Sequence, residues 1–229
     1  MTAVLFDFSG TLFRVESAES WLRGALTEAG VHLPEAELTA AAHALETAGA
    51  LPGGAHPVEL PEELAGLWAV RDRSAELHRA AYTGAARRVP LPDPVLYDVL
   101  YDRHMSPAAW APYPDAAEVL RTLRERGVAV GVVSNIGWDL RPVFREHGLD
   151  AYVDAYVLSC EHGVQKPDPR LFAAACEELG ADPRATLMVG DDRHADGGAA
   201  ALGCGVHFVD HLPVTERPDG LRPVLDLAG

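Results

Sequence analysis

The chain has 229 residues, of which 48% are hydrophobic and 23% charged, a composition typical of a globular protein with a buried core. Its formal net charge is -15 at pH 7, which argues against nucleic acid as a partner, because such binding depends on lysine and arginine neutralising phosphates. No apolar run suits a signal peptide or a membrane span, so we expect a cytoplasmic protein without a membrane partner.

The first predicted element is a short buried strand over 3–6 with the sequence AVLF, and Asp7 follows it at once. Residues 14–111 are rich in alanine and glutamate and are broken by segments that contain proline and glycine. They contain no convincing buried strand. This pattern predicts a helical insertion after the first strand.

Helices and strands alternate from about residue 112 to 210. The predicted elements are a helix over 115–126, strands over 128–133 and 151–158, a helix that begins at Pro169, and strands over 186–189 and 206–209. This alternation predicts an α/β fold with an open parallel sheet. Asp115 and Glu118 are spaced to form a capping box on the first of these helices, and Asp168 to cap the second. The proline-punctuated tail from Pro213 is expected to lie on the surface.

Polar side chains follow four of the predicted strands. In an open parallel sheet the carboxyl ends of the strands meet in one crevice, so these side chains should gather there. They are Asp7, Ser134, Asn135, Lys166, Asp191, Asp192 and Asp196. Lys166 is the only lysine of the chain, and its compact charge suits work that arginine cannot do. Because unpaired buried charge is costly, we expect a divalent cation among the carboxylates.

These strand ends carry four segments in the order FDFSGTL, VVSN, GVQKPDPRLF and MVGDDRHADGGAA. Together they resemble the motifs of the haloacid dehalogenase superfamily, in the branch with a helical cap inserted after the first motif. The resemblance spans residues 4–200. It implies a Rossmann-like parallel sheet core over 1–13 and 112–229 and an α-helical cap over 14–111. It also implies a Mg²⁺-dependent hydrolase, a phosphatase whose substrate is a small anionic metabolite.

By this resemblance, Asp7 is the catalytic nucleophile and becomes an aspartyl phosphate during turnover. The resemblance places Mg²⁺ between the Asp7 carboxylate, the backbone carbonyl of Ser9 and Asp191. Asp192 or Asp196 would complete the metal site, either through water or by orienting the lysine.

The same resemblance assigns residues to the phosphoryl group. Ser134 and the Asn135 amide would donate hydrogen bonds to its oxygens, and Lys166 would stabilise the charge during transfer. Thr11 would support the loop after Asp7 and belong to the phosphate site.

Ser9 departs from the family pattern. Phosphatases of the family carry aspartate at this position, where it protonates the leaving group and then activates water. A serine hydroxyl is not a general acid near neutral pH. The contribution of general acid catalysis, a rate enhancement of about 10²- to 10⁴-fold, should therefore be reduced or absent. Hydrolysis of alkyl phosphates is therefore expected to be slow.

Two other functions stay open at this point. The first is a slow phosphotransfer, sensing or binding module with impaired hydrolysis. The second is a hydrolase of non-phosphate substrates, such as a dehalogenase. Dehalogenases of the family carry tyrosine at the position of Ser9 and lack the first aspartate of the fourth motif, whereas Asp191 is present here. Neither the physiological substrate nor the oligomeric state is indicated by the sequence.

The helical insertion carries a group of basic residues near its middle. They are Arg71, Arg73, His78, Arg87 and Arg88. Two interpretations compete: these residues meet a second anionic group of the substrate, or they form a solvated helix face with apolar side chains packed beneath it.

Overall fold

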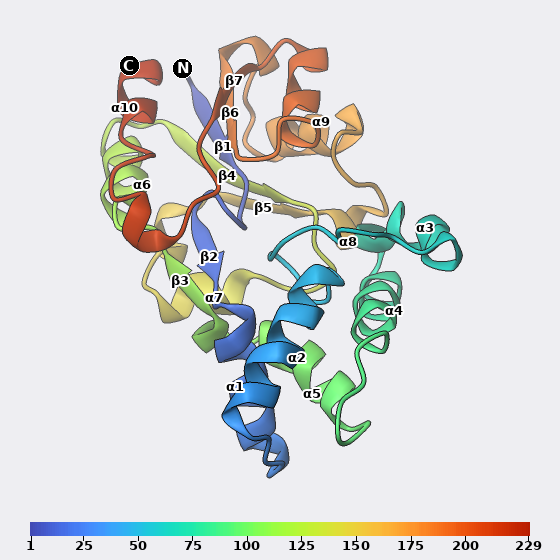
Figure 1. Ribbon diagram of the computed structural model, residues 1–229. Coiled ribbons are helices and arrows are strands. Elements are labelled where there is room, and N and C mark those ends of the chain that lie inside the picture. Colours follow the sequence, from blue (N-terminus) through green and yellow to red (C-terminus); the bar gives the residue numbers. More distant parts are fainter. The chain divides into compact units, whose positions relative to one another are not determined.

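Five parallel strands form the central sheet of the computed structural model, which describes residues 1–229 (Figure 1). They are β1 (Ala3–Phe6), β4 (Ala129–Ser134), β5 (Ala155–Leu158), β6 (Thr186–Gly190) and β7 (Gly205–Phe208), in the order β5-β4-β1-β6-β7. Every residue of the central strand β1 is fully buried, as expected where helices cover both faces of a parallel sheet. The predicted α/β fold with a parallel sheet is confirmed.

Helices flank the sheet on both faces (Figure 1). They are α6 (Ala116–Glu125), α7 (Arg141–Glu146), α8 (Ser159–His162), α9 (Pro169–Glu178), α10 (Pro223–Leu227) and the 3₁₀ helix η5 (Asp196–Leu202). On one face, Leu171 and Phe172 of α9 join Leu5, Val133 and Met188 in a single buried cluster. This core anchors the strands whose ends carry the polar residues.

The contacts between residues divide the chain into two compact units. The sheet unit contains Met1–Arg14, Asp72–Ser74 and Ala111–Gly229, and the helical unit contains Val15–Arg71 and Ala75–Trp110. The helical insertion between β1 and β4 is confirmed; that it acts as a cap, with the boundaries given above, stays a prediction. No helix in either unit has the length and apolar character needed to cross a membrane.

The helical unit is built from five α-helices. They are α1 (Ala18–Ala29), α2 (Glu35–Thr47), α3 (Glu62–Trp68), α4 (Ala75–Ala86) and α5 (Leu96–His104). Helix α1 packs against α2 and α5, and the indole N–H of Trp21 donates to the carbonyl of Leu100 at 2.8 Å. Two short strands, β2 (Phe13–Val15) and β3 (Trp110–Pro112), pair with each other where the insertion begins and ends.

The predicted capping box at the start of α6 is wrong. Asp115 stands at the N-cap position, but its side chain makes no capping hydrogen bond. Its Oδ2 instead accepts from the backbone N–H groups of Leu221 at 2.7 Å and Arg222 at 3.2 Å. The cap predicted at Asp168 is confirmed, since this side chain accepts from the N–H of Arg170 at 3.0 Å.

The tail from Pro213 lies mostly on the surface, as expected, but four of its side chains are buried. Leu221 and Val224 are fully buried, and Arg217 is only 4% exposed. Helix α10 packs against α6 (Figure 1). This packing brings the backbone N–H groups of Leu221 and Arg222 within hydrogen-bond distance of the buried Asp115 side chain. Part of the chain after β7 is therefore packed into the sheet unit.

Candidate active site

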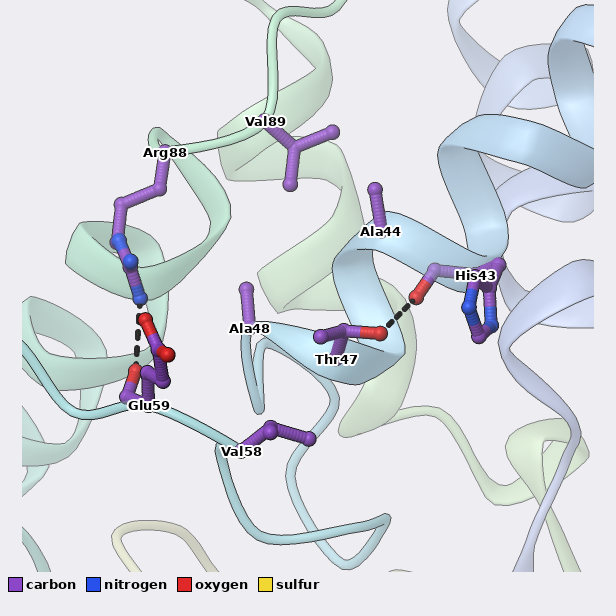
Figure 2. A pocket seen from close by; sticks show the side chains of 8 residues that line it. All are labelled: His43, Ala44, Thr47, Ala48, Val58, Glu59, Arg88 and Val89. Carbon is purple, nitrogen blue, oxygen red and sulfur yellow. Dashed lines mark hydrogen bonds between the residues drawn. The ribbon is translucent and has the colours of Figure 1, made fainter.

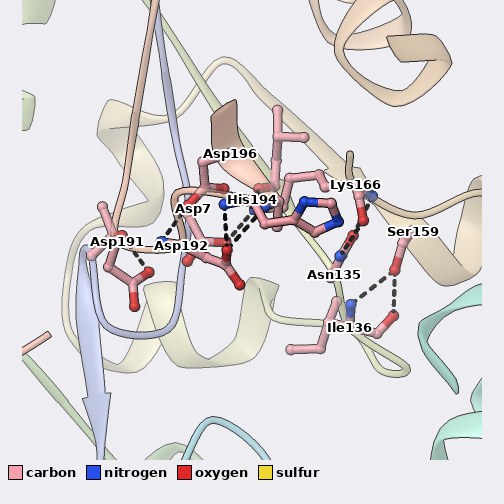
Figure 3. Close-up of polar contacts among 12 residues, drawn as sticks. Asp7, Asn135, Ile136, Ser159, Lys166, Asp191, Asp192, His194 and Asp196 are labelled. Carbon is pink, nitrogen blue, oxygen red and sulfur yellow. Dashed lines mark hydrogen bonds and ion pairs between the residues drawn. The ribbon is translucent and has the colours of Figure 1, made fainter. Parts of the chain in front are cut away.

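The carboxyl ends of the central strands lie level with one another. Phe6, the last residue of β1, is aligned with Val132 of β4 and with Val189 of β6. Asp7 therefore leaves the sheet between two neighbouring strands, and its backbone N–H donates to the carbonyl of Val189 at 2.9 Å. The Asp7 side chain is buried among the residues that follow the other strands (Figure 3).

Lys166 is 3% exposed, and its ammonium group donates hydrogen bonds to three acceptors. Its Nζ lies 2.6 Å from Oδ1 of Asp7 and 2.6 Å from Oδ1 of Asp196. It also lies 3.0 Å from the carbonyl oxygen of Val133 at the end of β4. One lysine thus joins the ends of three strands.

Asn135 holds the backbone of this lysine. Its side-chain oxygen accepts from the N–H of Lys166 at 2.7 Å, and its side-chain nitrogen donates to the Lys166 carbonyl at 3.0 Å (Figure 3). The two hydrogen bonds join the loop after β4 to the loop after β5. Because both ends of the Asn135 amide group are used in this way, its side chain positions the lysine.

Three carboxylates face the single ammonium group. Oxygen atoms of Asp7, Asp191 and Asp196 all lie within 4.8 Å of one another. Burial, together with the charges of Asp196 and Asp191, raises the pKa of Asp7 to about 8 even though Lys166 opposes the shift. Burial also raises the pKa of Asp196. The cluster therefore has more negative charge than Lys166 balances.

The lysine itself stays protonated. Burial alone would lower the pKa of Lys166, but the carboxylates of Asp196 and Asp7 outweigh it and hold that pKa above its usual value. An ammonium with these partners is a fixed positive charge at the strand ends.

The residues of this cluster fit a divalent cation of the magnesium type. Carboxylate oxygens are the ligands that Mg²⁺ prefers, and three of them from Asp7, Asp191 and Asp196 lie close enough to share one ion. The raised pKa of Asp7 indicates that this position favours a bound proton or a cation. The assignment of these residues as metal ligands stays a prediction.

Asp192 is placed differently from the other acidic residues after β6. Its Oδ1 accepts from the backbone N–H groups of His194 at 2.8 Å and Ala195 at 2.9 Å, so its side chain shapes the loop. Its own N–H donates to Oδ2 of Asp196 at 3.0 Å. Asp192 therefore supports Asp196, and its predicted contact with the metal stays a prediction.

The loop after Asp7 turns back toward Asp191. Thr11 is fully buried, and its Oγ1 donates to Oδ1 of Asp191 at 3.2 Å. Gly10 has φ +81°, and a Cβ at this position would lie 2.5 Å from Oδ2 of Asp191, so glycine is required there. Ser9 is half-buried and forms an isolated β-bridge with Phe13. The phosphate contact predicted for Thr11 stays a prediction.

Ser134 ends β4 next to Asn135, is 3% exposed and is aligned with Leu158 of β5. Ser159, which sequence analysis missed, follows Leu158 directly. Its Oγ accepts from the N–H of Ile136 at 2.8 Å and donates to the carbonyl of Asp72 at 2.5 Å. Its position directly after a predicted strand is the signal that could have identified it.

His211 and Arg217 were also missed. His211 Nδ1 lies 2.5 Å from Oδ2 of Asp191. Arg217 donates to the carbonyls of Gly10 at 2.6 Å and of Asp210 at 2.9 Å. The end of β7 was the one strand end to which we assigned no functional residue, and His211 lies there.

Arg71 and His78 of the helical unit are packed within that unit, whereas Arg87 and Arg88 are exposed. Arg71 lies 4.7 Å from the ring centroid of Trp68 and donates to its carbonyl at 2.8 Å. His78 is buried, and its Nδ1 lies 2.7 Å from the hydroxyl of Tyr101. These two residues follow the packed interpretation. Arg73 belongs to the sheet unit and is exposed.

A pocket of about 550 Å³ lies in the helical unit between α2, the end of α4 and residues 58–59 (Figure 2). Its walls include Ala44, Ala48 and Val89, and Arg88 at its edge donates to the backbone carbonyl of Glu59 at 3.1 Å. Of the residues considered for substrate contact only Arg88 lines this pocket, and none of the polar residues at the strand ends does. The acidic cluster at the strand ends remains the candidate site.

Comparison with known proteins identifies the family of the chain. The sequence model of the haloacid dehalogenase-like hydrolase family matches residues 1–203. The (S)-2-haloacid dehalogenase 4A of Burkholderia cepacia is 36% identical over 93 residues, 40% of either chain. Phosphoserine phosphatase of Thermus thermophilus is 36% identical over 113 residues, 48% of this chain and 42% of that one. The matched segments thus span less than half of both curated relatives.

The fold is similar to a solved dehalogenase. The structure of L-2-haloacid dehalogenase from Xanthobacter autotrophicus superposes with a TM-score of 0.67 at 27% identity. The match covers 93% of this chain and 79% of that chain. The similarity extends over both the parallel sheet and the helical insertion.

Proposed function

Because the chain belongs to the haloacid dehalogenase-like hydrolase family, we propose that it is a Mg²⁺-dependent phosphatase that acts on a small phosphorylated metabolite through an aspartyl phosphate on Asp7. One observation carries this proposal. The Asp7 carboxylate lies 2.6 Å from the Lys166 ammonium and within 4.8 Å of the carboxylates of Asp191 and Asp196. Phosphoryl transfer needs this combination of a nucleophile, a fixed positive charge and a cation site.

Asp7 would supply the nucleophile. Its carboxylate oxygen attacks phosphorus, the bond from phosphorus to the leaving oxygen breaks, and water then attacks the aspartyl phosphate to release inorganic phosphate. The raised pKa of Asp7 means that the cation-free side chain takes up a proton more readily than an ordinary aspartate. Bound Mg²⁺ would supply the positive charge that keeps this carboxylate ionised and lets it approach an anionic phosphate, with Asp7, the Ser9 carbonyl and Asp191 as ligands.

The residues after β4 and β5 would bind the phosphoryl group. Lys166 stabilises the charge that develops on its oxygens, and Ser134 donates from the neighbouring strand end. The Asn135 side chain is committed to the Lys166 backbone, so its contribution to the phosphate is its backbone N–H. Asp196 holds the lysine at 2.6 Å and keeps it aimed at Asp7.

Ser9 would limit the reaction. It occupies the position where phosphatases of the family carry the aspartate that protonates the leaving group. Leaving groups that depart without a proton, such as aryl oxides and acyl groups, are therefore the preferred ones, and alkyl phosphates react slowly. This makes the substrate class narrower than that of a typical phosphatase of the family.

The test is a screen of aryl, acyl, sugar and alkyl phosphates for phosphate release, with Mg²⁺ and with EDTA. We expect Mg²⁺-dependent release that is lost in Asp7→Asn, whose amide neither attacks phosphorus nor carries charge. Phosphate release that persists in Asp7→Asn would contradict the proposal, because the nucleophile would then lie elsewhere.

A dehalogenase is the second candidate, favoured by the similarity to two proteins named as haloacid dehalogenases. Asp191 argues against it, because this carboxylate completes a cation-binding set that dehalogenases of the family lack. Halide release from a 2-haloacid in EDTA would support this candidate over the phosphatase. A slow phosphotransfer or sensing module, the third alternative, would instead hold a long-lived phosphoryl group on Asp7 after exposure to acetyl phosphate.

A further inference from the structure

Both carboxylate oxygens of Asp191 receive a hydrogen bond from elsewhere in the sheet unit. Oδ1 accepts from Thr11 Oγ1 at 3.2 Å, and Oδ2 lies 2.5 Å from His211 Nδ1. Burial would raise the pKa of Asp191, but opposing interactions, of which the hydrogen bond from His211 is the largest, hold that pKa below its usual value. Two donors on opposite oxygens fix the rotation of this carboxylate.

Arg14 determines which ring nitrogen of His211 carries the proton. The guanidinium Nη1 of Arg14 contacts His211 Nε2. A guanidinium has only N–H donors, so Nε2 must accept, and the ring proton of neutral His211 then lies on Nδ1. His211 therefore donates this proton to Asp191, as a second donor alongside Thr11.

Arg217 holds the two loops that carry these donors. Its guanidinium lies 3.2 Å from the ring centroid of Tyr113 and donates to the carbonyls of Gly10 and Thr11 on one loop. It also donates at 2.9 Å to the carbonyl of Asp210, the residue before His211. The distance between the Thr11 loop and the His211 loop is thus set by one buried side chain.

We propose that His211 is a positioning residue that presents Asp191 to the divalent cation of the active site, with its ring oriented by Arg14. The inference rests on the proposed function, since it needs the cation site. The family model ends at residue 203, whereas His211 and Arg217 lie beyond it. The two residues thus act from outside the matched segment on Thr11, Arg14 and Asp191, which lie within it.

The experiment is titration of the purified protein with Mg²⁺ by calorimetry, which measures affinity without turnover. We expect His211→Ala to weaken Mg²⁺ binding by about 10- to 100-fold, the usual effect of losing a partner that orients a metal ligand. His211→Asn should retain most of the affinity, because the Asn amide nitrogen occupies nearly the place of Nδ1 and donates the same hydrogen bond. His162→Ala, which removes an exposed histidine of α8, is the matched control and should bind Mg²⁺ like the unmodified protein.

Arg14→Leu gives a second measurement that leaves both His211 and Asp191 in place. It should also weaken Mg²⁺ binding, by less than His211→Ala, because the ring loses the contact that fixes its tautomer. Thermal unfolding in EDTA checks that each variant is folded before titration.

The outcomes separate this inference from the proposed function. If Asp191→Asn abolishes Mg²⁺ binding while His211→Ala binds as tightly as the unmodified protein, the cation site stands and the role of His211 is overturned. Equal weakening in His211→Ala and His211→Asn would also overturn it, because the donated hydrogen bond would then not matter. If the unmodified protein binds no Mg²⁺ at its carboxylates, the cation site itself fails and the inference falls with it.

Discussion

The ammonium nitrogen of Lys166 lies 2.6 Å from the carboxylate of Asp7, and both side chains are buried. Asp191 and Asp196 lie beside this pair, so the one ammonium group is surrounded by three carboxylates. The stability of the sheet unit and the proposed chemistry both depend on it.

Lys166→Met should unfold more easily than the unmodified protein in EDTA, by about 3 kcal/mol, because it leaves Asp7 and Asp196 buried without their partner. Phosphate release should be abolished. Urea unfolding followed by circular dichroism measures the first effect. Arg124→Met is the matched control, since it removes an exposed ion pair with Asp154 and should change stability by less than about 1 kcal/mol. A Lys166→Met variant as stable as this control would show that the ion pair is not important for folding.

Ser9→Asp should accelerate hydrolysis of an alkyl phosphate by about 10²- to 10⁴-fold, because it restores a group that can protonate the leaving oxygen. Hydrolysis of an aryl phosphate should change little, because an aryl oxide departs without a proton. Ser9→Asn has the size of aspartate without its acidity and should give no gain. If the two substrates respond equally to Ser9→Asp, the missing acid is not what limits the reaction.

Mg²⁺ should raise the unfolding temperature of the protein. An ion that binds only the folded state at 100 times its dissociation constant adds about 2.7 kcal/mol of stability. Asp191→Asn should remove this increase, whereas Asp226→Asn, at an exposed position on α10, should keep it. Thermal unfolding at several Mg²⁺ concentrations makes the measurement. An increase of the same size in Asp191→Asn would place the ion elsewhere.

The helical unit should lose stability in mild acid. Burial lowers the pKa of His104 from 6.5 to about 3, and burial and the charges of His104 and Arg71 lower that of His78 as well. The unfolded chain takes up these protons near pH 6.5, so protonation favours unfolding as the pH falls from there toward 3. Between pH 7 and 5.5 the loss of stability from His104 is about 1 kcal/mol, and His78 contributes in the same direction.

The measurement is urea unfolding at both pH values for the unmodified protein and for His104→Gln. The variant should lose less stability between the two pH values, because glutamine does not titrate. His32→Gln replaces an exposed histidine of the same unit and should keep the full pH dependence. Equal pH dependence in His104→Gln and the unmodified protein would mean that His104 is not neutral in the folded state.

The strand ends of the sheet were predictable from the sequence. A parallel strand covered on both faces is apolar throughout, so the first charged residue after β1 or β6 marks where the strand ends. Because the strands are parallel, the residues that follow them, Asp7, Lys166 and Asp191, are expected at one edge of the sheet. The structure places them together there. Their roles in binding and catalysis stay predictions.

The residues after β7 were not predictable in the same way. Residues 209–217 form no regular helix or strand beyond one short turn, so no periodicity indicates which side chains face inward. His211 contacts Asp191, which precedes it by 20 residues, and Arg217 contacts Gly10, which lies 207 residues before it. Asp115 failed as a capping residue for the same reason, because its partners come from the folded tail.

The three contacts of the Lys166 ammonium have a consequence for phosphate affinity. An ammonium has three hydrogens, and here Asp7, Asp196 and the Val133 carbonyl occupy all of them. A phosphoryl oxygen that binds this nitrogen must displace one of those acceptors or share its hydrogen. Binding therefore replaces an existing hydrogen bond and does not add a new one. Inorganic phosphate alone should consequently be a weak inhibitor, and tight binding must come from contacts with the rest of the substrate molecule.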